Sequence, residues 1–245
     1  MNMRSRIMLL VLIFPGLAFA AATPTADAPP EEALAWLISL GNGPHAGFPN
    51  PPEVGEVRSF IERDPDRYLP AFVTMMDELL AAQGDERRAV LLERLSRLPE
   101  FFPTDRLEPL VTEWFATMHE QLLSELQVYE DLKQASPDTA FELSSANRKR
   151  AGYLRFSQDN LLTWAQQQGS DALVEPALAR LESMSYEVRQ SSTFYIEYLG
   201  YRAKERPDVF LRLAAISASH ENSSDFAAKR VARDIQKTLD EMRAR

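Results

Sequence analysis

Two glutamates, seven residues apart, are the first candidates for chemistry in this 245-residue chain. In a helix, Glu113 and Glu120 would project from one face beside Trp114. Paired carboxylates are the groups that cleave glycosidic bonds, so this spacing admits an enzyme acting on cell-wall glycan. The same spacing is also typical of a solvated acidic helix face in a glutamate-rich chain, and we favour that interpretation.

The three histidines do not form a metal-binding pattern. His119 and Glu120 begin like the helix of zinc peptidases, but Leu123 stands where the second imidazole must lie one turn later. The absence of cysteine excludes thiolate ligands, disulfides and a cysteine nucleophile. Gly-x-Ser-x-Gly, Ser-x-x-Lys and Walker motifs are also missing. We therefore expect no metal, no cofactor and no catalytic residues beyond the glutamate pair.

Aromatic residues are concentrated in residues 186–202, which we expect to form one helix with two apolar faces. Two apolar faces indicate two neighbours, and in stacked helix pairs the second neighbour is the adjacent repeat. The alternative is a partner-binding stripe, because Tyr and Arg anchor protein interfaces. Its candidate residues are Phe194, Tyr198, Tyr201 and Arg202. We expect Phe194 to be buried and Tyr198 to lie at the rim between packed surface and water.

The charge of the chain argues against nucleic acid and anionic lipid as ligands. The formal net charge is −9. Without Arg4 and Arg6, the only charged residues among the first twenty, 25 basic residues face 36 acidic ones and the net charge is near −11. Phosphate backbones and anionic lipid require clustered Lys and Arg.

The first twenty residues have the pattern of a cleaved signal peptide. Two arginines precede an apolar run at residues 7–19, and Ala18-Phe19-Ala20 predicts a cut after Ala20. A run of about a dozen residues is short for a hydrocarbon core of about 30 Å, so we expect no stable membrane insertion after cleavage. An exported chain without cysteine fits a bacterial periplasm best, or secretion. Residues 21–30 should be a disordered leader because they contain no large apolar side chain, and residues 31–245 should form one domain.

From residue 52 onward the apolar periodicity is helical, and no stretch alternates like a strand, which predicts an all-α fold. Two long helices, 107–132 and 137–169, should pair as a central antiparallel hairpin. Pro137 suits the first turn of the second helix and Gly169 suits its end. With a turn near residue 135, Arg150 should lie opposite Glu120, and the basic cluster at 148–150 should lie near Glu120 and Glu125 on a solvated face with weak ion pairs.

In residues 173–200, Pro176 stands near the start of a first helix, a polar break follows at 183–185, and Val188-Arg189 precedes Leu199-Gly200 at the close of a second helix. This pattern resembles a HEAT repeat. A further pair, 207–217 and 224–239, begins about 31 residues later, and a looser pair occupies 68–82 and 86–98. The resemblance implies an α-solenoid with an elongated central hairpin, and an irregular helical bundle is the alternative.

The resemblance, together with the lack of a complete catalytic constellation, implies a function in binding. We expect an exported, non-catalytic helical-repeat protein that binds another protein or peptide as a scaffold or adaptor in the cell envelope. Two alternatives remain open at this point. One is the glycan-active enzyme that uses Glu113 and Glu120, and the other is self-assembly through the long hairpin as a possible homodimer.

Overall fold

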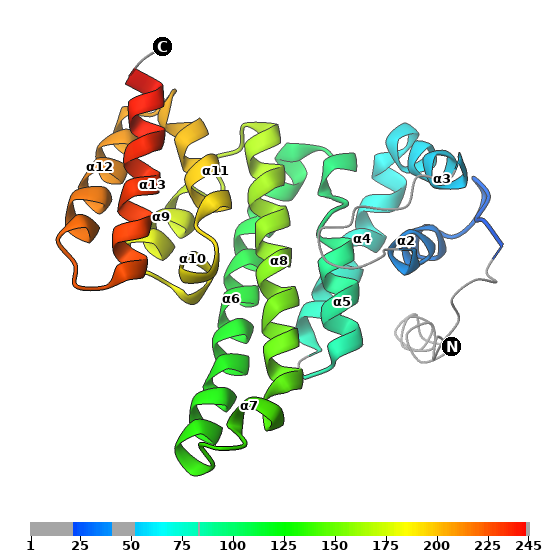
Figure 1. Cartoon of the computed structure of the whole chain (residues 1–245). Coiled ribbons are helices and arrows are strands. Elements are labelled where there is room, and N and C mark those ends of the chain that lie inside the picture. The colour runs from blue at the N-terminus through cyan, green and yellow to red at the C-terminus, as the bar shows by residue number, and fades with distance from the viewer. Residues whose placement is uncertain (1–21, 41–51, 83, 244–245) are drawn as a thin grey trace.

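The computed structural model describes residues 22–40, 52–82 and 84–243. Across these ranges the regular structure is entirely helical and no strand occurs, which confirms the expected all-α fold (Figure 1). No helix within the same ranges is both long enough and apolar enough to cross a membrane. The expected signal peptide, 1–20, lies outside the described residues.

The helices lie side by side in a row that runs from α2 and α3 at one end to α12 and α13 at the other (Figure 1). The N-terminal elements are α2 (Pro30–Ser39), α3 (Pro52–Arg63), α4 (Pro65–Ala81), α5 (Glu86–Leu95) and the 3-10 turn η1 (Pro99–Phe101). The central elements are α6 (Thr104–Ala135), α7 (Ala140–Leu143) and α8 (Ser145–Gln168). The C-terminal elements are α9 (Val174–Ser183), α10 (Tyr186–Gln190), α11 (Thr193–Ala203), α12 (Pro207–Glu221) and α13 (Phe226–Arg243). Proline begins four of these helices because its fixed φ suits the first turn and its missing N–H has no helical acceptor there.

The antiparallel pair α6 and α8 forms the middle of the row, and α8 packs against α5 on one side and α11 on the other. As expected, α8 ends at Gly169, which adopts the left-handed conformation (φ 65°). The expected register is wrong, because Arg150 pairs with Glu125 instead of Glu120, at 2.7 Å (Nε–Oε1) and 2.8 Å (Nη2–Oε2). The short helix α7 lengthens the connection and shifts the reversal toward the C-terminus, so that Pro137 lies in the turn before α7. The pair is also largely buried instead of solvated, since the two side chains are 13% and 12% exposed.

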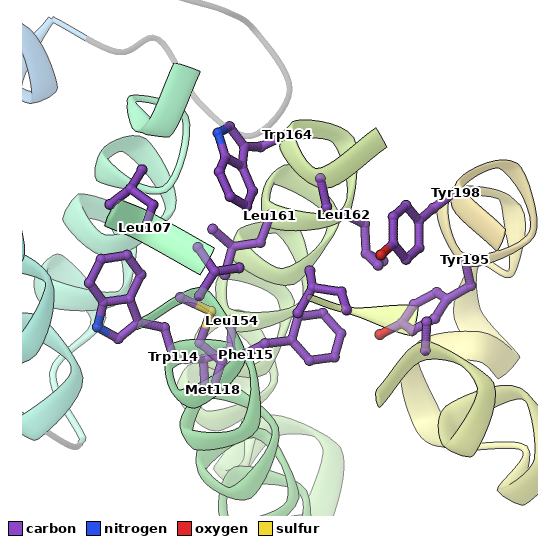
Figure 2. Packing of buried hydrophobic residues seen from close by; sticks show 14 of the residues in the cluster. Leu107, Trp114, Phe115, Met118, Leu154, Leu161, Leu162, Trp164, Tyr195 and Tyr198 are labelled. Atoms are coloured by element: carbon purple, nitrogen blue, oxygen red, sulfur yellow. The ribbon is translucent and has the colours of Figure 1, made fainter. Parts of the chain in front are cut away.

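One apolar core runs through the row from α2 to α13. Figure 2 shows its centre, where side chains of α6 and α8 meet the rings of Tyr195 and Tyr198 from α11. Phe115 and Tyr195 contact edge to face, with ring centroids 6.3 Å apart. On the other side of α6, Trp114 contacts Phe72 of α4 in the same manner, with ring centroids 5.8 Å apart. The hairpin is therefore the element against which both ends of the row pack.

The single helix expected over 186–202 is broken into α10 and α11. Ser191 between them is extended (φ −154°, ψ 107°). Gly200 does not close the second helix, because α11 continues to Ala203. Its role is close packing: a Cβ atom at Gly200 would lie 2.6 Å from the Cγ2 atom of Thr238 in α13.

Residues 22–29, which we expected to be a disordered leader, lie against α4 in this structure. Pro24 is buried. The guanidinium group of Arg67 donates to the carbonyl oxygens of Ala26 (2.6 Å) and Ala28 (2.7 Å). Composition does not reveal such an attachment, because the acceptors belong to the backbone and not to the side chains.

Candidate functional site

The two glutamates expected to be paired are both exposed on α6. Trp114 between them is only 2% exposed, and its indole Nε1 donates to Asp77 at 2.9 Å. A sugar ring would need an accessible aromatic face beside the carboxylates, and here that face is used by the core. The structure therefore does not bring Glu113, Glu120 and Trp114 together in one groove.

The aromatic stripe of α11 is not an exposed surface. Tyr198 is fully buried, whereas Phe194 is only partly buried, which reverses the expected order. Arg202 is 7% exposed and its Nε donates to Asp171 at 2.6 Å, so Tyr201, at 38% exposure, is the one exposed member of the four candidates. The expected order of burial assumed one continuous helix over 186–202. Because the helix is interrupted before α11, a different face of α11 meets the core. Tyr198 and Arg202 hold α11 to the end of α8 and do not form a binding surface.

Of the seven large apolar side chains that are exposed in the described ranges, four lie at the end of the hairpin, and Tyr201, Leu211 and Phe226 lie on the C-terminal helices. Every residue of α6 after Leu122 is at least partly exposed, because the neighbouring helices cover only the first part of α6. Figure 1 shows this end, with α7, extending beyond the other helices. We call residues 123–148 the projecting end. Its exposed large apolar side chains are Leu123 (47%), Val128 (39%), Phe141 (62%) and Leu143 (59%).

The projecting end carries more negative than positive charge. Its acidic residues are Glu125, Glu130, Asp131, Asp138 and Glu142, and its basic residues are Lys133 and Arg148. Arg148 covers the ring of Phe141, with its guanidinium carbon 3.9 Å from the ring centroid. The surface thus combines accessible apolar side chains with a negative surrounding field.

A hollow of about 240 Å³ lies between α9 and α12. Its lining residues are Glu182, Arg212, Ala215, Ile216, Ser219 and His220. Arg212 is already paired with Glu175 (2.6 Å) and Glu182 (2.9 Å), and Nε2 of His220 donates to the carbonyl oxygen of Leu181 (2.7 Å). The charged groups of this hollow therefore bind one another and are not directed toward a ligand.

A buried polar cluster, which the sequence analysis did not identify, joins α6, α8, α10 and α11. Nδ1 of His119 donates to Oε1 of Glu187, and both residues are buried. Asp159 of α8 is 2% exposed, and neither of its carboxylate oxygens has a hydrogen-bond partner within the described part of the chain. The same holds for Oε2 of Glu187 and for the hydroxyl of Tyr195. Buried polar groups without partners are rare in proteins, which marks this cluster as unusual.

The pKa values of the two carboxyl groups of the cluster shift in opposite directions. Burial raises the pKa of Asp159 to about 7, and the nearby carboxylate of Glu187 adds to this effect against the attraction of Arg155. Burial also acts to raise the pKa of Glu187, but its hydrogen bonds with His119 and with its own backbone, and the charge of His119, bring that pKa below the ordinary value. Near neutral pH the cluster therefore contains one ionised carboxylate and one carboxyl group close to its titration midpoint.

No group of three or more His, Asp and Glu side chains in the described ranges is arranged to hold a metal ion. Comparison of the chain with models of protein families finds no match. Comparison with curated proteins finds no match, and comparison with solved structures finds none. The functional conclusion consequently rests on the geometry of this chain alone.

The sequence holds a faint signal of the buried cluster. Asp159 lies three residues before Leu162, so that it shares helical spacing with a buried apolar residue. Glu187 directly precedes buried Val188. A charged residue at the helical spacing of core residues indicates that its side chain is buried. The spacing does not reveal which residues of other helices contact it.

Proposed function

We propose that this chain is an exported, non-catalytic helical-repeat protein that binds another protein of the cell envelope through the projecting end of the α6–α8 hairpin. The observation that carries the proposal is the exposure of four large apolar side chains where the hairpin extends beyond its neighbours. Monomeric soluble proteins rarely expose clustered apolar surface unless it takes part in an interaction. Export remains a proposal that rests on the arginine-led apolar run and the Ala-Phe-Ala site of residues 1–20.

The repeat character is also a proposal, supported by the arrangement of the C-terminal helices. The layer of α12 and α13 packs on the layer of α9 and α11, and α11 packs in turn on α8, so that each layer contacts the one beside it in space. Such nearest-neighbour packing is the principle of helical-repeat proteins. In this proposal the row of helices serves as a rigid support that presents the hairpin end.

The charge of the projecting end restricts the chemistry of its partner. Acidic residues outnumber basic ones there, and the whole chain is acidic. A partner with an apolar patch flanked by Lys and Arg would bury the apolar side chains and meet a complementary potential, which favours a fast encounter. A second copy of this chain would bring like charges together, and we therefore favour a different, basic partner over self-assembly.

Site-specific photo-crosslinking in the native host tests this proposal. A photoreactive amino acid is placed at Val128 or Phe141, and a control is placed at Leu211, which is 68% exposed on α12 at the far end of the row. We expect the first two sites, and not Leu211, to capture one protein whose crosslinked peptide contains apolar residues next to Lys or Arg. Capture of this chain's own peptides would show self-assembly instead. Equal capture from all three sites would contradict the proposal.

A double substitution provides the matched binding measurement. Phe141→Ser with Leu143→Ser should weaken binding to the captured protein at least about tenfold, since truncation of central anchors typically costs 2 kcal/mol or more. Both side chains are more than half exposed, so the free energy of unfolding should change by no more than about 0.5 kcal/mol. Leu211→Ser is the control and should leave binding unchanged.

A further inference from the structure

The five-residue helix α10 connects the hairpin to the C-terminal helices. On one side Glu187 accepts the hydrogen bond from His119 of α6. On the other side Nη1 of Arg189 lies 2.6 Å from Oδ2 of Asp225, and Nη2 of Arg230 in α13 donates to the carbonyl oxygen of Arg189 at 2.8 Å. The segment before α10 contains Met184 in the left-handed conformation (φ 50°), which is unfavourable for a side chain that is not glycine. Side-chain contacts therefore hold α10 in place on both sides.

Asp159 lies where α8 meets this connection. It is buried near Glu187 and Tyr195, and its carboxylate oxygens have no hydrogen-bond partner within the described residues. A second buried carboxylate without a partner opposes the packing of α10 and α11 on the hairpin whenever it is ionised. A protonated carboxyl group removes this repulsion and can donate to a neighbouring oxygen.

We propose that Asp159, together with Glu187 and His119, forms a proton-binding site that controls how tightly α10 and α11 are held against the α6–α8 hairpin. When Asp159 carries a proton, the helices are docked. When Asp159 loses the proton, a second carboxylate is buried in the junction without a hydrogen-bond partner, and α10 and α11 open more often. The site is independent of the proposed protein-binding surface, which lies on the projecting end.

The charged groups around Asp159 come from each neighbouring element. Arg155, one turn earlier on α8, attracts the ionised form of Asp159, and Glu187 of α10 opposes it. From α6, His119 acts on Glu187. In α11, the hydroxyl of Tyr195 is buried, and the charges of Asp159 and Glu187 both act on it. The attraction of Arg155 is thus set against burial and a second carboxylate.

Two further elements complete the surroundings. From α9, the charge of Arg180 acts on Tyr195. On the opposite side of α8, α5 places the carboxylate of Glu93 next to Arg97 and its carbonyl oxygen next to Asn160. Glu93 therefore already has a cationic partner, Arg97, which follows the end of α5. Burial and Glu187 together exceed the attraction of Arg155, and the pKa of Asp159 rises to about 7, within the range where a moderate change of pH alters its charge.

Hydrogen exchange followed by mass spectrometry tests the proposal on the full mature chain. Exchange of the amides of residues 186–203 is measured at pH 6 and pH 8 and corrected for the intrinsic change of exchange rate with pH. We expect opening of this segment to increase about tenfold from pH 6 to pH 8, because opening releases Asp159 to water and a proton with it. In the Asp159→Asn protein the corrected exchange should be slow and equal at the two pH values.

The control is Asp131→Asn, which changes an exposed aspartate of α6 and should keep the tenfold pH dependence. A wild-type chain without pH dependence in residues 186–203 would overturn the proposal, as would an Asp159→Asn protein that retains it. If Asp159→Asn fails to fold, the carboxyl titration of Asp159 in the wild-type chain, followed by NMR, decides the matter. A midpoint near 7 supports the site and a midpoint near 4 overturns it.

Discussion

The hydroxyl of Tyr198 donates a hydrogen bond of 2.8 Å to the carbonyl oxygen of Ser170, and this bond joins α11 to the residue that follows the left-handed end of α8. Ser170 is itself buried, so its carbonyl oxygen depends on Tyr198 for a partner. Tyr198 therefore places a large ring in the core and provides a hydrogen-bond donor for a backbone carbonyl oxygen that is distant in the sequence.

Substitutions on α11 should therefore separate Tyr198 from Phe194. Tyr198→Ala should lower the free energy of unfolding by about 3–5 kcal/mol because a fully buried ring is removed. Phe194→Ala should cost about 1–2 kcal/mol because its ring is only partly buried. Tyr198→Phe keeps the ring and should cost about 1–2 kcal/mol, since the carbonyl oxygen of Ser170 loses its partner. Urea unfolding of the three proteins measures these differences, and equal losses for the two alanine variants would contradict the burial described here.

The close approach of α11 to α13 at Gly200 predicts a substitution that can be rescued. Gly200→Ala should destabilise the chain by about 1–3 kcal/mol, because the new Cβ would lie 2.6 Å from Cγ2 of Thr238. Thr238→Ser removes that methyl group, so the double variant should recover most of the loss in a double-mutant cycle. Gly152→Ala is the matched control within α8, where a Cβ meets nothing within 4 Å, and it should stabilise by about 0.5–1 kcal/mol. Thermal melts with the same sign for both alanine variants would refute this packing.

The ion pair at the base of the projecting end should contribute more than an ordinary surface pair. Glu125→Gln should lower the free energy of unfolding by about 2–3 kcal/mol, because Arg150 would keep its charge in a largely buried position. Lys149→Ala is the comparison, since Lys149 pairs loosely with Glu86 at 3.7 Å and both side chains are well exposed. That change should stay within about 0.5 kcal/mol. Denaturant titrations in which both variants behave alike would show that burial of the Glu125–Arg150 pair has no energetic effect.

The global stability of the chain should fall as pH rises through the range set by Asp159. A carboxyl group with a pKa of about 7 in the folded chain and an ordinary value of 3.8 binds its proton more tightly when folded. Its cost is absent below about pH 4, grows between pH 4 and pH 7 and is complete above pH 7, where it reaches about 4 kcal/mol. Asp159→Asn should thus stabilise the chain strongly at pH 8 and barely at pH 4. Unfolding free energies at these two pH values provide the measurement, and a constant difference between wild type and variant would contradict the assignment.

Local patterns were sufficient to predict most helices of this protein, but not the interruptions before α8 and before α11. The apolar periodicity of residues 107–132, the left-handed stop at Gly169 and the prolines of the first turns are properties of short segments, and each acts through backbone geometry that does not depend on distant residues. The two C-terminal helices expected near 207–217 and 224–239 occur as α12 and α13 for the same reason.

Partners between distant segments could not be predicted in this way. The offset that pairs Arg150 with Glu125 depends on how many residues the turn at α7 uses, because each residue more or less shifts every later side chain along α8 and around its axis. The helix is interrupted at Ser191, and in α11 Tyr198 is fully buried whereas Phe194 packs against the core from a partly buried position. The cluster of His119, Asp159 and Glu187 arises only when three helices meet, because burial and neighbouring charge, which set the pKa of each carboxyl group, are properties of the packed chain and not of the residue itself.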